Sequence, residues 1–189
     1  MNTLHLETLS LPQVRALYRD RLQEDFPPDE VKPLDAIERA FARGGYRCFG
    51  AMDGAETLAY AFFVVHEGTA LFDYLAVRKD LRDSGVGSRF LQALMAGPFR
   101  DWDCVLLEVD DPDAAPDQAE RDHRDRRLRF YLRNGLTDTG VRANVWRVDY
   151  RILSLPVGTP RTAEEMRAIY AALYRAIMPP ALCERMVKV

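Results

Sequence analysis

The stretch "YLAVRKDLRDSGVGSRFL", residues 74–91, decides how the rest of the sequence is interpreted. Its first letters continue a strand-like run, and its last letters have the apolar spacing of a helix. Arg82, Gly85 and Gly87 lie between the two. Glycines let backbone amides turn toward a ligand, the following helix adds the positive end of its dipole, and arginine donates strongly to phosphate oxygens. The stretch therefore predicts a strand, an anion-binding loop suited to pyrophosphate, and a helix.

Two familiar nucleotide-binding motifs do not fit this loop. A Walker loop needs a lysine after its last glycine, and the dinucleotide fingerprint needs a small residue where Phe90 stands. The glycines could instead only shape a tight turn from strand to helix, and this stretch alone leaves that alternative open.

The flanking patterns supply the remaining elements. Earlier in the chain they predict a strand, two helices around a proline-rich loop, and a meander of strands, in residues 4–10, 10–22, 34–43, 46–52, 57–65 and 70–77. After the helix that begins near residue 84, they predict a strand, a charged helix, two closing strands and a tail helix, in residues 104–109, 119–135, 141–148, 149–155 and 162–178. A capping box of Thr162 and Glu165 is expected to open the tail helix. A strand, helix and strand in sequence imply a parallel pair. The predicted class is α+β, with a mixed, mostly antiparallel sheet and helices on both faces.

The composition bounds the function. With 189 residues, 48% hydrophobic and 29% charged, the chain is predicted to form one domain, residues 1–189, in which 156–189 are a helical extension. A net charge of −3 gives no electrostatic reason to expect nucleic acid or a membrane surface as partner. The start of the chain has no signal-peptide pattern, so a cytoplasmic location is expected. The three cysteines lack metal-ligand spacing, and no metal is predicted.

A second motif gives the loop its context. The later segment "LRFYLRNGL", residues 128–136, looks like the FYxxxGF segment of the GNAT superfamily of N-acetyltransferases, whose Q/RxxGxG/A loop resembles residues 82–87. The order of elements agrees as well, so the resemblance covers roughly residues 4–155. It implies the acyl-CoA N-acyltransferase fold, in which two parallel strands splay apart, and an acyltransferase that uses acetyl-CoA as co-substrate.

The resemblance also implies where coenzyme A binds. Its pyrophosphate would be held by the loop amides, and its pantetheine would pair with the main chain of the preceding strand: Arg82, Asp83, Ser84, Gly85, Val86, Gly87 and Ser88, and Leu75, Ala76 and Val77. The later helix departs from the family pattern, because Arg124 and Arg127 replace an asparagine and an alanine. We expect Arg127 to reach a CoA phosphate instead.

Two residues are candidates for proton transfer. Tyr131 occupies the position from which the family commonly protonates the CoA sulfur, and the alternative is a tyrosine that only packs beside Phe130. Glu108 is the leading base, because strand alternation places it on one face with Asp110 near the expected thioester. The alternative for Glu108 is a salt bridge to an arginine in residues 124–133.

The acceptor is expected to be a small-molecule or protein amine. Phe26, Asp29 and Glu30, in the loop between the first two helices, and Asp73 in the strand before the glycine loop could receive a cationic amine. The alternatives are a rigid solvent loop and an Asp73 that pairs with an arginine. The apolar stripe of the tail helix predicts packing on the domain or on a second copy. A CoA-binding sensor without catalysis, or a protein that binds another nucleotide, is the rival function.

Overall fold

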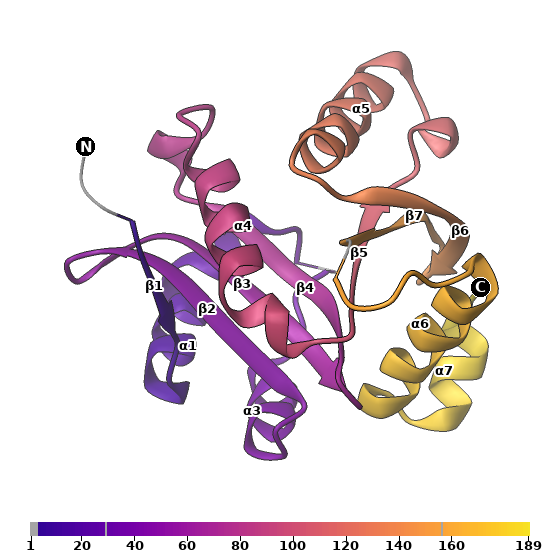
Figure 1. The fold of residues 1–189 in the computed structure, drawn as a ribbon, viewed down its shortest axis with the longest axis horizontal. Coiled ribbons are helices and arrows are strands. Elements are labelled where there is room, and N and C mark those ends of the chain that lie inside the picture. The colour runs from indigo at the N-terminus through magenta and orange to yellow at the C-terminus, as the bar shows by residue number, and fades with distance from the viewer. Residues whose placement is uncertain (1–3, 29, 156) are drawn as a thin grey trace. The chain divides into compact units, whose positions relative to one another are not determined.

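The computed structural model describes residues 4–28, 30–155 and 157–189, and these form two compact units. The first unit contains residues up to Val65 together with Asp73–Leu94, and the second contains His66–Phe72 together with Met95–Val189. Figure 1 draws the first unit from indigo to magenta and most of the second from pink to yellow. The assignment of the whole chain to one domain stays a prediction.

The first unit is built on antiparallel strands. β1 (His5–Thr8) pairs with β2 (Tyr46–Asp53), and β2 pairs with β3 (Glu56–His66). The hydrogen-bonded order continues to β4 (Thr69–Val77), whose second half lies in this unit. β3 is buried without interruption from Ala59 to Val64, as expected for a strand covered on both faces.

The described residues of the first unit also form helices. They are α1 (Leu11–Leu17), followed by a π-helical segment (Tyr18–Leu22), then α2 (Gln23–Asp25), α3 (Leu34–Ala42) and most of α4 (Val86–Ala96). Figure 1 shows α4 in front of the strands of this unit and α1 and α3 behind them. α4 buries Val86, Phe90 and Leu94, one helical turn apart, so one apolar face fixes the helix on its unit.

The second unit contains the parallel pair that the sequence predicts. The first half of β4 pairs in parallel with β5 (Cys104–Asp110), from Thr69 opposite Cys104 to Phe72 opposite Leu107. This ladder stops there, although β4 continues to Val77 and β5 to Asp110. β7 (Val148–Leu155) pairs antiparallel with β5 and with β6 (Thr137–Val145). The predicted mixed sheet is therefore confirmed.

The described residues of this unit also form the α-helices α5 (Gln118–Arg133), α6 (Ala163–Ile177) and α7 (Pro180–Met186). α6 begins with the predicted capping box, since Glu165 N–H donates to Thr162 Oγ1 at 3.2 Å and Thr162 N–H donates to Glu165 Oε2 at 2.7 Å. Its buried side chains Tyr170, Leu173 and Tyr174 place it in the core of its own unit. None of the helices in the described residues is long and apolar enough to cross a bilayer.

Two local predictions are wrong. The closing hairpin turns at Trp146 and Arg147, with φ of 51° and 69°, so β6 runs from Thr137 to Val145 rather than through residues 141–148. A tryptophan and an arginine with positive φ lack the glycine or asparagine that normally marks such a turn. The tail also continues beyond α6, because Pro180 opens α7, where proline is tolerated, and β8 (Val187–Lys188) then pairs with β6.

Candidate active site

The loop between β4 and α4 has the geometry of an anion-binding turn. Asp83 and Gly85 have φ of 61° and 82°, and a Cβ placed on Gly85 would meet no atom within 4 Å. Within the described residues, five backbone N–H groups of this loop donate to no acceptor: those of Asp83, Gly85, Val86, Gly87 and Ser88. Three of them open α4, where the positive end of the helix dipole lies. The loop therefore offers several donors to one anion.

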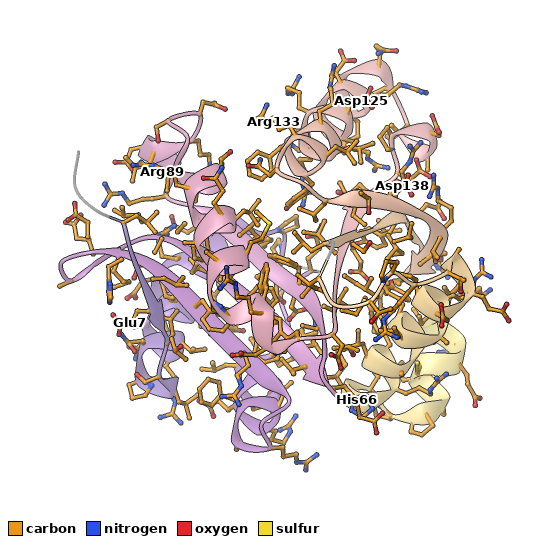
Figure 2. All side chains as sticks on the ribbon, viewed as in Figure 1. Glu7, His66, Arg89, Asp125, Arg133 and Asp138 are labelled. Atoms are coloured by element: carbon orange, nitrogen blue, oxygen red, sulfur yellow. The ribbon has the colours of Figure 1, made fainter. Side chains whose placement is uncertain are left out.

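Positive side chains lie at the same loop. Arg82 is half exposed, and its Nε donates to the carbonyl of Val77 at 3.4 Å. Arg89 projects from the first turns of α4 and is exposed (Figure 2). These arginines add charge to the donors of the loop, as phosphate recognition requires.

A nearly buried carboxylate holds Arg82 in place. The side chain of Asp25, at the end of α2, is 2% exposed and accepts from Arg82 Nη2 at 3.3 Å. It also accepts from the hydroxyl of Tyr60 at 3.0 Å and from Arg21 Nη2 at 3.3 Å. The sequence does not predict this role for Asp25, because an acidic residue at the end of a short helix has no pattern that distinguishes it from a solvent-exposed one.

The end of β4 lies beyond the parallel ladder. Leu75, Ala76 and Val77 follow Phe72, the last residue of β4 paired with β5. The next amide, of Arg78, donates to the carbonyl of Leu58 at 2.8 Å. The parallel ladder thus ends before these three residues, and their assignment to pantetheine stays a prediction.

Asp73 binds two donors within the first unit. The ammonium of Lys32 donates to Asp73 Oδ1, and the hydroxyl of Tyr46 donates to Asp73 Oδ2. The carboxylate is 9% exposed. Burial, followed by the negative charge of Asp73, raises the pKa of Tyr46 well above its usual value, so its hydroxyl keeps the proton that it donates. The alternative expected for Asp73 was an ion pair with an arginine, but its partners are Lys32 and Tyr46.

Tyr74 brings the other predicted acceptor residues to the same place. Its ring packs edge-on against Phe26 with 4.9 Å between centroids, and its hydroxyl donates to the carbonyl of Glu30 at 2.8 Å. The same hydroxyl accepts from the backbone N–H of Lys32 at 2.8 Å, and Lys32 Nζ lies 5.5 Å from the ring centroid. The structure therefore gathers Phe26, Glu30 and Asp73, while Asp29 lies outside the described residues.

Glu108, in the second unit, is held by the tail helix. Its Oε1 accepts from the hydroxyls of Tyr170 and Tyr174, the latter at 2.6 Å. The two tyrosines are one turn apart on α6, with 5.1 Å between ring centroids. Burial, and then the charge of Glu108, raises the pKa of both phenols, so both remain protonated donors. The apolar spacing of the tail helix predicted their burial but not their hydroxyl contacts.

Tyr131 meets the main requirement of a proton donor. It is 6% exposed on α5, and burial raises the pKa of its hydroxyl against the opposing effect of Arg127. Its ring also packs edge-on against Phe130 at 5.2 Å, so the catalytic and packing roles both stay open. Arg127 Nη1 donates to Asp110 at 2.8 Å and Arg124 Nη1 to the carbonyl of Asp111 at 3.0 Å, and these contacts tie α5 to the end of β5.

Comparison with known proteins decides the family. Residues 11–135 match the acetyltransferase (GNAT) family. The chain belongs to this family. The assignment confirms the predictions of a GNAT acyltransferase with acetyl-CoA as co-substrate. No curated protein sequence matches this GNAT chain.

Solved structures agree on the fold. A GNAT-family protein from Bacteroides thetaiotaomicron is 18% identical, with a TM-score of 0.74, over 92% of this chain and 98% of its own. The ribosomal-protein-S18-alanine N-acetyltransferase from Escherichia coli is 19% identical, with a TM-score of 0.59, over 84% of this chain and 97% of its own. A GNAT acetyltransferase from Elizabethkingia anophelis with acetyl-CoA bound is 10% identical, with a TM-score of 0.56, over 82% and 99%. At these identities the likeness shows the fold alone.

Proposed function

We propose that this GNAT protein transfers an acetyl group from acetyl-CoA to a primary amine by direct attack of that amine on the thioester. The observation that carries the proposal is the loop of residues 82–88, whose unpaired amides, positive φ values and arginine suit a pyrophosphate. The Elizabethkingia anophelis structure holds acetyl-CoA, and the Escherichia coli enzyme acts on an alanine amine, which supports both halves of the reaction for this fold.

The reaction needs a base because acceptor amines are protonated. An alkylamine with a reference pKa of about 10.4 lies ~3.4 units above pH 7, so presenting its neutral form costs about 4.6 kcal/mol. Glu108 would take this proton directly or through water, and its position is fixed by the hydroxyls of Tyr170 and Tyr174. The amine nitrogen then bonds to the carbonyl carbon as the carbon–sulfur bond breaks. The extra proton on the new amide nitrogen leaves through water and restores the proton that Tyr131 gives to the sulfur.

The leaving thiolate needs an acid. Tyr131 would deliver a proton to the CoA sulfur, and the raised pKa of its phenol keeps that proton available at neutral pH. Arg127 would approach a CoA phosphate, for which it would have to exchange its contact with Asp110.

Thermal unfolding tests the cofactor half of the proposal. A ligand present at a hundred times its dissociation constant adds about 2.7 kcal/mol to the free energy of unfolding, which raises the midpoint by roughly 5–11 °C for a domain of this size. We expect this rise with CoA and acetyl-CoA but not with ATP or NAD. An equal rise with ATP or NAD would favour the rival nucleotide-binding protein.

Tyr131→Phe separates the enzyme from a CoA-binding sensor. The substitution removes one hydroxyl and keeps the edge-on packing against Phe130. We expect about a hundredfold lower rate of thiol release with an amine panel, and unchanged CoA binding. A wild-type protein that binds CoA but releases no thiol with any amine would support the sensor.

A further inference from the structure

The most informative feature outside the cofactor loop is an ammonium group that the chain binds within itself. We propose that Asp73, Tyr46 and Tyr74 form a binding site for the primary alkylammonium of the acceptor, and that Lys32 fills this site until the acceptor displaces it. This inference rests on the proposed function and names the class of its acceptor: an unhindered alkylamine with a lysine-like chain.

The chemistry of the site is that of alkylammonium recognition. Asp73 supplies the negative charge, and the Tyr46 hydroxyl occupies its other oxygen, so a single oxygen faces the cation. Tyr74 places an aromatic ring 5.5 Å from the nitrogen, within the range of a cation–π contact. One carboxylate oxygen and one ring fit a compact ammonium better than a planar guanidinium, which prefers two parallel acceptors.

The parts of the site differ in how firmly they are held. Asp73, Tyr46 and Tyr74 belong to strands; the Asp73 side chain is 9% exposed, and the two tyrosine residues are each 3% exposed. The side chain of Lys32 is 37% exposed and belongs to the loop between α2 and α3. Solvent reaches the lysine end of this ion pair and weakens it, whereas Asp73 stays in place on its strand. An incoming alkylammonium would make the same contacts, so the exchange needs little free energy.

The position on β4 connects the site to the reaction. Asp73 precedes Leu75 by two residues, which corresponds to roughly 7 Å along a strand. Leu75 begins the segment that the proposed function gives to pantetheine. An amine held near Asp73 would therefore lie close to the path of the thioester along the same strand.

The electrostatics also predict what the site rejects. A carboxylate next to the amine, as in an α-amino acid, would face the charge of Asp73 and be repelled. Diamines, polyamines and lysine side chains carry no such group beside their terminal ammonium. Phe26, packed on Tyr74, adds apolar surface for their methylene chain.

The experiment removes the internal ammonium and supplies one from solution. Lys32→Ala is titrated with n-butylamine at pH 7.5, without any CoA compound, and thermal unfolding is followed. We expect a saturable rise of the midpoint in Lys32→Ala, with an apparent dissociation constant about tenfold lower than in the wild type. The double variant Lys32→Ala/Asp73→Asn should show no saturable rise, and n-butanol, which has the same chain without the charge, should give none in either variant.

Equal titrations of the wild type and Lys32→Ala would overturn the proposal, as would an equal response to n-butanol. If Lys32→Ala does not fold, Lys32→Met keeps the apolar stem and is titrated in its place. Because no CoA compound is present, failure here leaves the separate CoA experiment unaffected. The two ideas can therefore fail independently.

Discussion

Two carboxylates on strands, Asp73 in the first unit and Glu108 in the second, each accept hydrogen bonds from two side chains, but the donors differ in charge. Asp73 is bound by an ammonium and a phenol that come from different segments of the chain. Glu108 is bound by two phenols from one turn of α6. A cationic partner balances the charge of a carboxylate and can be replaced by another cation. Neutral hydroxyl donors fix the position of a carboxylate without adding a positive charge. The cationic partner of Asp73 therefore favours its proposed role in recognition, and the neutral partners of Glu108 favour its proposed role in proton transfer.

Glu108→Gln should have the largest effect. The glutamine keeps an acceptor for Tyr170 and Tyr174 but removes the base, so we expect kcat to fall by roughly 10²–10⁴ with CoA binding unchanged. Steady-state thiol release with a responsive amine measures it. Glu184→Gln, an exposed carboxylate on α7 of the same unit, is the control and should leave kcat unaltered. A loss below threefold in Glu108→Gln would remove the catalytic half of the comparison.

Asp73→Asn should give the opposite kinetic pattern. Loss of the charge weakens the binding of a cationic acceptor, so we expect KM for alkylamines to rise by about 10–100-fold with kcat nearly unchanged. Rates with a panel of mono- and diamines at fixed acetyl-CoA measure this. A fall of kcat without a change in KM would instead make Asp73 the base, and the roles of the two carboxylates would be reversed.

The sequence predicted the features that have a local pattern. The glycines predicted the turn before α4, the order of elements predicted the parallel pair, and a capping box predicted the start of α6. The structure has each of these features at nearly the expected residues. These depend on neighbours within a few positions, so the chain displays them directly. The turn at Trp146 was missed because its conformation contradicts its residue types.

The contacts of the two carboxylates could not be predicted in the same way. Asp73 meets Lys32 across 41 positions and Glu108 meets Tyr174 across 66. Lysine and tyrosine are common, and no spacing connects them to a distant acid. Alternation within a strand identified both carboxylates as candidates, but their partners depend on how the helices and loops pack.

Tyr174→Phe tests how the tail helix serves Glu108. The hydroxyl donates to Glu108 Oε1 at 2.6 Å and helps to fix the orientation of the carboxylate, so its loss should let the proposed base leave its productive position. We expect kcat near neutral pH to fall by about fivefold, with KM unchanged. An unchanged kcat in a protein that loses stability would mean that Tyr174 is only part of the core.

Asp25→Asn should have the smallest effect, and it adds a third carboxylate to the comparison. Asp25 touches Arg82 rather than an acceptor or a base, so its loss should change cofactor affinity alone. The amide can still accept from Tyr60 and Arg21, and Arg82 loses only an exposed contact at 3.3 Å. We expect CoA to bind about threefold more weakly, because a loosened arginine must be ordered when the pyrophosphate binds. Calorimetric titration of CoA measures it, with Asp20→Asn, an exposed carboxylate of the π-helical segment away from the loop, as the control. Tighter binding in Asp25→Asn would show that Asp25 competes with the pyrophosphate for Arg82, in the way that Asp73 is proposed to exchange Lys32 for an acceptor.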